Sequence, residues 1–329
     1  MRRRRQLPLP SRLSWALTAL ALAGCAAMIW QTHRVPVLAP HAKVERWALV
    51  PVLPDGTTTT EPSPGKVVVS RSGRVPQIPV QVGESTLQFV VDTGAERSVL
   101  RQGRLAEAGL PSHAPGPVQR VRGVNASTQA ISVALEELRI GDRRWSEQPF
   151  LVLDAEPLFE LLAPEAHGIL GRPFLGEQVL RIEPDQVALA SPEHAASLLA
   201  DLEALPTTLD ARGVRVPVTL DGVELVAWID TGAQSSSLST EAAERVGIQG
   251  PLRPGGGQLG AAGVAVDLVE ADFGALNIGA NRLHRPSLQV GHTDQRVELR
   301  LGMDLLGQLP AFALDYGEGL AYVPPPRGG

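Results

Sequence analysis

One short segment occurs twice in this chain, and it constrains the fold more than any other feature. Phe89–Leu100 and Ala227–Leu238 each begin with an apolar run, continue as Asp-Thr-Gly-Ala, and then turn polar. An apolar run rich in β-favouring residues predicts a buried strand, and the glycine that follows permits a tight turn. Asp92 and Asp230 are therefore both expected at the mouth of a turn, directly after a buried strand. Two carboxylates in identical settings indicate one site built from both.

The repeat extends well beyond this segment. The two aspartates are 138 residues apart, and the same spacing aligns further pairs of segments, namely Ile78–Val82 with Val216–Leu220 and Leu138–Gly141 with Leu276–Gly279. Towards the end the spacing falls to 131, where Ile169–Gly171 aligns with Arg300–Gly302. Each repeat spans about 120 residues, which is typical of a small domain rather than of a solenoid unit.

These motifs resemble those of retropepsin-type aspartic proteases, in the form that carries two such units in one chain. Val91–Leu100 is similar to the active-site strand and turn of that family, and Ile169–Leu175 to its second signature, which packs behind the active-site turn. The resemblance covers residues 67–189 and 207–323. It implies an all-β fold of two lobes related by pseudo-twofold symmetry, with the active site at their interface and no cofactor.

The resemblance also implies roles for individual residues. Asp92 and Asp230 would together activate a water molecule, while the two threonines hydrogen-bond between the turns and lock them together. The neighbouring residues expected to support the active site are Thr93, Gly94, Ala95, Thr231, Gly232 and Ala233. The family also carries a flap, a hairpin that closes over bound peptide, and the candidates for the two flaps are Arg122, Gly123, Val124, Gly260 and Ala261.

The second flap candidate lies in a glycine-rich stretch with another possible meaning. Gly255–Gly263 matches the G-x-G-x-x-G pattern of dinucleotide-binding loops. That pattern requires a buried strand before it and a helix after it. Here Pro254 precedes the stretch and a β-like segment follows it, so a flap is the better interpretation.

The two repeats differ at positions where the family has a charged pair. The first repeat has Glu96 and Arg172, for which we expect a structural ion pair, whereas the second has Gln234 and Met303. The active-site cleft is therefore expected to be asymmetric. Arg300 stands where the family has an apolar residue, which is unusual for the segment that packs behind the second aspartate.

The N-terminus predicts export. Arg2–Arg5 precede an apolar run, Leu13–Trp30, which is typical of a signal peptide or membrane anchor. Leu22–Cys25 resembles a bacterial lipobox, so Cys25 is a candidate for lipidation; the alternative is an uncleaved anchor, since the run is just long enough to cross a bilayer. We expect a membrane-attached protein in the periplasm of a Gram-negative bacterium.

The expected organisation is as follows: a signal peptide or anchor over residues 1–30, a proline-rich tether over 31–66, a first lobe over 67–190, a linker helix over 191–206, and a second lobe over 207–325. Within the lobes we expect short helices at Gln102–Ala108 and at Glu241–Val246, the second with Ser239 or Thr240 as its N-cap.

Other chemistries are disfavoured. The formal net charge of −5 argues against a nucleic-acid partner, and the seven histidines show no metal-ligand spacing, so no metal is expected. His167 is expected to be a loop residue with satisfied hydrogen bonds rather than a cleft residue. The sequence thus predicts an aspartic endopeptidase acting on peptides or proteins as a monomer. Two alternatives stay open: a catalytically silent peptide-binding module on the same fold, and pairing of lobes between chains.

Overall fold

The computed structural model describes residues 75–111, 116–122, 127–141, 143–176, 178–210, 213–248, 250–259, 265–291 and 297–326. The chain divides into two units, Met1–Thr57 and Thr58–Gly329, and all described residues belong to the second. The predicted anchor, the tether and Cys25 lie outside the described residues. In the described part of the chain, no helix has the length and apolar character needed to cross a membrane.

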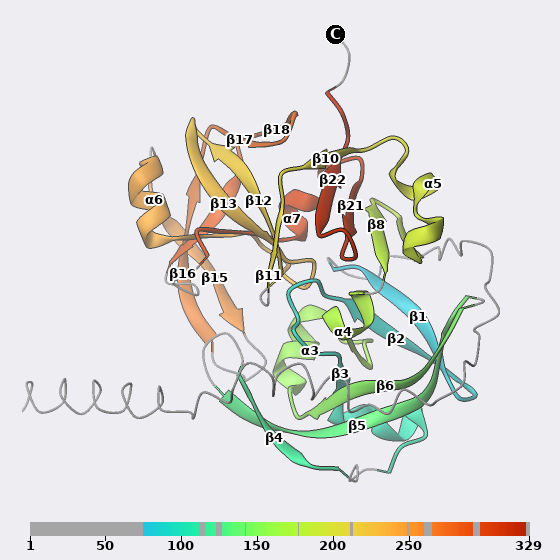
Figure 1. Cartoon of the computed structure of the whole chain (residues 1–329). Coiled ribbons are helices and arrows are strands. Elements are labelled where there is room, and N and C mark those ends of the chain that lie inside the picture. Colours follow the sequence, from blue (N-terminus) through green and yellow to red (C-terminus); the bar gives the residue numbers. More distant parts are fainter. Residues whose placement is uncertain are drawn as a thin grey trace, which may run out of the picture. The chain divides into compact units, whose positions relative to one another are not determined.

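The first repeat folds as a seven-stranded sheet (Figure 1). Its strand order is β1 (Gln77–Val82), β2 (Ser85–Val91), β7 (Gly168–Leu170), β3 (Val99–Arg101), β6 (Arg143–Leu153), β5 (Ser127–Ile140) and β4 (Val118–Arg122). Strand β1 also pairs with β5, which curls the sheet into a barrel. Alternate residues of β1, among them Ile78 and Val80, are fully buried, as expected for strands with one face on a core.

The second repeat follows the same plan in a ten-stranded sheet. Its main path runs β15 (Arg253–Leu259), β16 (Ala265–Asp272), β19 (Ser287–Gly291), β14 (Ser237–Ser239), β20 (Leu299–Leu301), β13 (Val223–Ile229), β12 (Gly213–Leu220), β17 (Ala275–Ile278) and β18 (Asn281–His284), with β11 (Thr208–Asp210) beside β12. The parallel pair β13–β20 repeats the parallel pair β2–β7 of the first lobe. The internal duplication of the sequence is thus a duplication of the fold, and the all-β prediction is confirmed.

A third sheet contains strands from both repeats. Its order is β10 (Glu203–Leu205), β22 (Leu320–Val323), β21 (Phe312–Asp315), β8 (Val179–Glu183) and β9 (Gln186–Ala190). The pairing of β8 with β21 joins the end of the first repeat to the end of the second, residue Leu180 opposite Leu314. Backbone hydrogen bonds within one chain therefore link the two lobes.

The linker helix predicted over 191–206 does not form as one helix. The segment contains a 3-10 turn, η2 (Pro192–His194), and a single helical turn, α5 (Ala196–Leu199). Its last residues form β10, which pairs with β22 near the C-terminus. This long-range pairing overrides the local helical preference of the Ala- and Leu-rich segment.

The other helices are short and stand beside the sheets. The helix predicted at Gln102–Ala108 is confirmed as a 3-10 helix, η1, and α6 (Thr240–Val246) begins at the predicted Ser239 cap, whose hydroxyl accepts from Ala242 N at 3.1 Å. Helices α4 (Arg172–Leu175) and α7 (Met303–Leu306) occupy matching places in the two repeats. Helix α3 (Glu156–Leu162), with a proline in its first turn, has no counterpart among the described helices of the second repeat.

Candidate active site

The two Asp-Thr-Gly turns begin where a central strand of each lobe ends. Strand β2 ends at Val91, and Asp92 N then donates to Leu170 O at 3.0 Å. Strand β13 ends at Ile229, and Asp230 N donates to Leu301 O at the same distance. The parallel neighbours β7 and β20 thus hold the start of each turn in the same way.

Backbone amides of each turn orient its carboxylate. Asp92 Oδ1 accepts from Gly94 N at 2.8 Å and from Ala95 N at 3.0 Å. Asp230 Oδ1 accepts from Gly232 N at 3.1 Å. In both turns Oδ1 is thus tied to the backbone, and these bonds leave the second oxygen of each carboxylate available for chemistry.

The threonines join the two turns by four hydrogen bonds. Thr93 Oγ1 donates to Ile229 O at 2.9 Å and accepts from Thr231 N at 3.1 Å. Thr231 Oγ1 donates to Val91 O at 2.6 Å and accepts from Thr93 N at 3.0 Å. Both side chains are completely buried. Each threonine therefore makes the same two bonds to the opposite turn.

The glycines bring each turn against the carboxylate of the other. A Cβ atom at Gly94 would lie 2.6 Å from Asp230 Oδ1, and one at Gly232 would lie 2.5 Å from Asp92 Oδ1. Real Cβ atoms do not approach other atoms so closely, so only glycine fits at these two positions. The absence of a side chain is what allows the two aspartates to face one another.

Burial and mutual repulsion change the acidity of the aspartates. Burial, together with the negative charge of Asp230, raises the pKa of Asp92. Burial also raises the pKa of Asp230, but the nearby Arg300 guanidinium works in the opposite direction. Two carboxylates in this setting cannot both ionise easily, so near neutral pH the pair retains one proton.

The family's second signature lies behind each turn, as the resemblance implies. In the first lobe Arg172 N donates to Ala95 O at 3.0 Å, and Gly171 N donates to Ser98 Oγ at 3.1 Å. In the second lobe Met303 N donates to Ala233 O at 2.8 Å, and Gly302 N donates to Ser236 Oγ at 2.9 Å. These bonds fix the far side of both turns.

The second lobe has an additional support that sequence reasoning missed. Asp304 accepts hydrogen bonds from Ser236 N, at 2.9 Å to either carboxylate oxygen, and from Ser236 Oγ at 2.6 Å. Burial raises the pKa of this carboxyl. The first repeat has Pro173 at the aligned position, so the two turns are held by different groups.

The aligned residues Glu96 and Gln234 differ in their surroundings, because Gln234 contacts the opposite lobe whereas Glu96 is exposed. Gln234 Nε2 donates to the carbonyls of Leu161 at 2.9 Å and Leu162 at 3.2 Å, at the end of α3 in the first lobe. Arg172 Nη1 donates to Asp210 O at 2.9 Å, while Glu96 is exposed. The Glu96–Arg172 ion pair stays a prediction.

In the sequence, the flap candidates lie at or directly after the last residues of strands β4 and β15. Arg122 is the last residue of β4 and pairs with Ser127 of β5, and Leu259 of β15 pairs with Ala265 of β16. Residues 255–259, the described part of the glycine-rich stretch, therefore belong to strand β15 rather than to a nucleotide-binding loop. The Arg122 side chain and the candidates Gly123, Val124, Gly260 and Ala261 lie outside the described residues.

Two further residues near the aspartates were not recognised from the sequence as site residues. Arg300 Nη1 lies 3.8 Å from Asp230 Oδ2. Tyr316, directly after β21, is buried, and its pKa is raised by that burial and by the charges of Asp92 and Asp230. The only feature of the sequence that pointed to Arg300 was its departure from the apolar pattern of the family. No feature of the sequence pointed to Tyr316 as a site residue.

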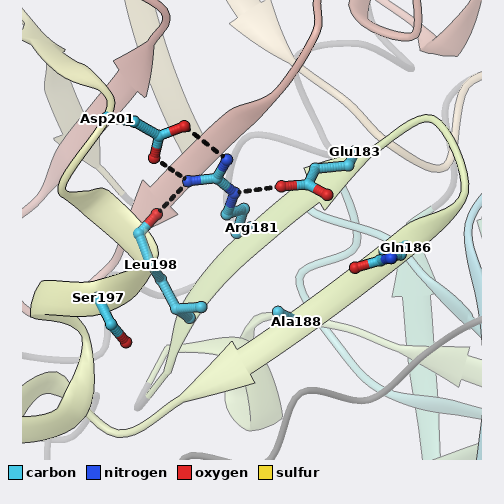
Figure 2. A pocket seen from close by; sticks show the side chains of 7 residues that line it. All are labelled: Arg181, Glu183, Gln186, Ala188, Ser197, Leu198 and Asp201. Atoms are coloured by element: carbon cyan, nitrogen blue, oxygen red, sulfur yellow. Dashed lines mark hydrogen bonds and ion pairs between the residues drawn. The ribbon is translucent and has the colours of Figure 1, made fainter.

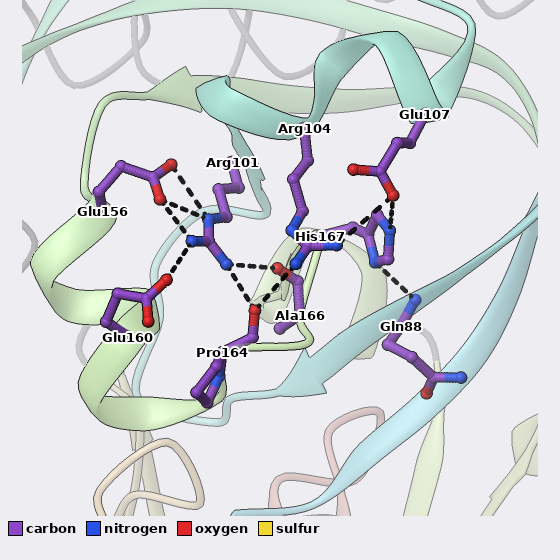
Figure 3. Close-up of polar contacts among 9 residues, drawn as sticks. All are labelled: Gln88, Arg101, Arg104, Glu107, Glu156, Glu160, Pro164, Ala166 and His167. Carbon is purple, nitrogen blue, oxygen red and sulfur yellow. Dashed lines mark hydrogen bonds and ion pairs between the residues drawn. The ribbon is translucent and has the colours of Figure 1, made fainter.

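A polar network within the first lobe is structural (Figure 3). Arg101, which is buried, forms hydrogen bonds to Glu156 and Glu160 of α3 and to Pro164 O, the last at 2.7 Å. His167 Nδ1 accepts from Gln88 N at 3.1 Å, while its Nε2 lies 2.8 Å from Glu107 Oε2. His167 is thus the hydrogen-bonded loop residue that we expected.

The charged residues that line a pocket beside the third sheet are paired with one another (Figure 2). Arg181 of β8 donates to Asp201 at 2.5 and 3.0 Å, to Glu183 at 2.8 Å and to Leu198 O at 2.7 Å. These bonds hold α5 against β8. Neither Asp92 nor Asp230 lines this pocket, which is completed by Gln186, Ala188 and Ser197. Among the described residues, no three His, Cys, Asp or Glu side chains gather to hold a metal ion.

Comparison with known families supports the class that the fold and the two turns define. Residues 78–174 match the model of the family described as "Aspartyl protease", and residues 216–308 match that of "gag-polyprotein putative aspartyl protease". The two matches cover the two repeats, and each contains one Asp-Thr-Gly turn. The chain belongs to the aspartyl proteases and contains two units of that family, one in each repeat.

One solved structure similar to this chain is a retropepsin-like aspartic protease from Rickettsia conorii. It is 19% identical, with 37% of this chain and 90% of that chain covered, at a TM-score of 0.31. A search of curated proteins gives no match.

Proposed function

We propose that this protein is an aspartic endopeptidase in which Asp92 and Asp230 form one catalytic pair. The observation that carries the proposal is the reciprocal packing of the turns: each glycine lies against the carboxylate of the other turn, and each threonine bonds to the other turn. A pair of carboxylates that shares one proton can supply a general base and a general acid at once.

The reaction that such a pair supports has two stages. The ionised carboxylate takes a proton from a water molecule as the water oxygen bonds to the peptide carbonyl carbon, and the protonated carboxyl gives its proton to the carbonyl oxygen. The resulting gem-diol then collapses as its C–N bond breaks. The leaving nitrogen takes up a proton from the aspartate pair, and a hydroxyl group of the diol gives a proton back to the pair. No covalent bond forms to the enzyme, and the pair regains its starting state.

Peptides or proteins are the substrates, and the active unit proposed is a single chain. Two features support intramolecular pairing of the lobes: the β8–β21 ladder and the four threonine hydrogen bonds. Both join the repeats of one chain, so no second copy is needed to complete the site.

We further propose that the protein is exported and attached to the membrane by its N-terminus. The support is in the sequence: Arg2–Arg5, the apolar run Leu13–Trp30 and the lipobox-like Leu22–Cys25. If Cys25 is lipidated, bacteria fed labelled palmitate will label the wild-type chain but not Cys25→Ala. Labelling of neither chain, with both in the membrane fraction, would show an uncleaved anchor instead.

The endopeptidase proposal is tested with a peptide library derived from a denatured proteome. The full chain is incubated with the library between acidic and mildly basic pH, with and without pepstatin, and new peptide termini are identified by mass spectrometry. Pepstatin-sensitive cleavage within peptides is the expected result. Tight binding of peptides without cleavage at any pH would contradict the proposal and favour a peptide-binding module.

A further inference from the structure

Arg300 is a buried cation at a position where the first repeat has an aliphatic residue. It is the middle residue of β20, paired with Trp228 of β13 and Ser237 of β14. Its neighbours Leu299 and Leu301 are completely buried on the other face of the strand. The aligned residue of β7 is Ile169, which occupies the same place beside the first turn.

The surroundings of Arg300 do not fully satisfy its charge. Its Nη2 donates to Ser237 Oγ at 3.1 Å, and its Nε has no hydrogen-bond partner within the described structure. The residue is only 9% exposed. Burying an arginine in this way is unfavourable unless an anion compensates for it. The anion available is Asp230, whose Oδ2 lies 3.8 Å from Nη1.

This distance suits electrostatic support rather than a closed salt bridge. At 3.8 Å the guanidinium attracts the negative charge of Asp230 without a direct hydrogen bond to Oδ2. That oxygen therefore stays able to accept a proton from water. Because Asp230 is 7% exposed, solvent screens the attraction only weakly.

The other charged and titratable groups near the pair do not reproduce this effect at Asp92. Asp92 faces Asp230, an anion, and the amides of its own turn. Tyr316 lies near both carboxylates and is neutral at physiological pH, because its burial raises its pKa. The positive charge of Arg172 partly opposes that rise in the pKa of Tyr316. The cation beside Asp230 therefore distinguishes the two carboxylates.

We propose that Arg300 is a positioning residue that keeps Asp230 ionised and leaves the shared proton on Asp92. In the endopeptidase proposed above, on which this inference rests, Asp230 is then the general base that takes the proton from water. Asp92 is the general acid that protonates the peptide carbonyl oxygen. The two aspartates are not interchangeable in the free enzyme, although the turns that carry them are alike.

The test compares neutral and charged replacements of Arg300 in the full chain. Arg300→Gln removes the charge and keeps a donor for Ser237, Arg300→Ile copies the first repeat, and Arg300→Lys keeps the charge. Without the cation the ionised pair is less stable, so the bell-shaped pH profile of kcat/KM moves to higher pH by about 1 to 3 units. The profile of Arg300→Lys stays close to that of the wild type.

A measurement that needs no turnover separates this inference from the endopeptidase proposal. Carboxyl 13C shifts of aspartate-labelled chain are followed against pH, and the two signals are assigned with Asp92→Asn and Asp230→Asn. We expect Asp230 to lose its proton before Asp92 in the wild type, and this difference to shrink in both neutral variants. Unchanged titration and an unmoved pH profile in folded neutral variants would overturn the inference, even if the protein cleaves peptides.

Discussion

The threonine pair offers a quantitative test of how the two lobes are held together. Replacing Thr231 by valine preserves the shape of the side chain but removes its hydroxyl. That hydroxyl donates to Val91 O at 2.6 Å and accepts from Thr93 N at 3.0 Å, and all of these groups are buried. Each buried group left without a partner costs about 1–3 kcal/mol. Two groups lose their partner, so Thr231→Val is expected to lower the free energy of unfolding by roughly 2–6 kcal/mol.

The measurement is urea unfolding of the full chain, followed by tryptophan fluorescence, to which Trp145 and Trp228 of the two lobes contribute. Thr231→Ser is the matched control, because it retains the hydroxyl and loses only a methyl group, at a cost of about 1 kcal/mol. Thr93→Val should cost a similar amount to Thr231→Val, since each threonine makes the same pair of bonds. If Thr231→Val proves no less stable than Thr231→Ser, the hydroxyl bonds do not hold the turns together.

Three other expectations follow from the site and its support. Gly232→Ala places a methyl group 2.5 Å from Asp92 Oδ1, so peptide cleavage should be lost while the far-ultraviolet circular dichroism is kept; wild-type cleavage would contradict this packing. Arg101→Ala leaves the carbonyls of Pro164 and Ala166 without their donor and should lower the free energy of unfolding, measured by thermal unfolding, by about 2–3 kcal/mol. The control Arg144→Ala, at an exposed ion pair, should lower it by less than about 0.5 kcal/mol, and equal losses would refute a structural role for the network. Because burial and the charge of Asp230 raise the pKa of Asp92 to about 8, the shared proton is kept until that pH. The alkaline limb of the kcat/KM profile should therefore begin near pH 8, and an alkaline limb that begins below about pH 6 would contradict this environment.

Much of the fold was predictable because the local patterns agree with the tertiary structure. The two Asp-Thr-Gly turns follow buried strands, and Ser239 caps α6 as its side chain and position indicate. The predicted linker helix was wrong because Glu203–Leu205 pairs with strand β22, more than a hundred residues away. Helix α3 carries a recognisable sequence signal, a proline in its first turn before apolar residues.

The candidate site was less predictable than the turns that form it. Asp92, Asp230 and their neighbours were found because they are consecutive in sequence and repeated. Arg300 and Tyr316 are brought to the aspartates by the parallel pairing of β20 with β13 and by the third sheet, and neither register is encoded locally. Arg300 was noticed as an irregularity in an apolar pattern, but its effect on Asp230 depends on a distance that only the fold determines.

The central claim is that one catalytic pair is built from both repeats. It is tested most directly by kcat/KM for a cleaved library peptide, measured on the full chain as wild type, Asp92→Asn and Asp230→Asn. Asp185→Asn, on an exposed turn between β8 and β9, is the matched control, and thermal unfolding verifies that all four chains are folded. Each site variant is expected to lose at least about 100-fold, with the control unchanged. A folded variant of either aspartate that cleaves at the wild-type rate would contradict the account.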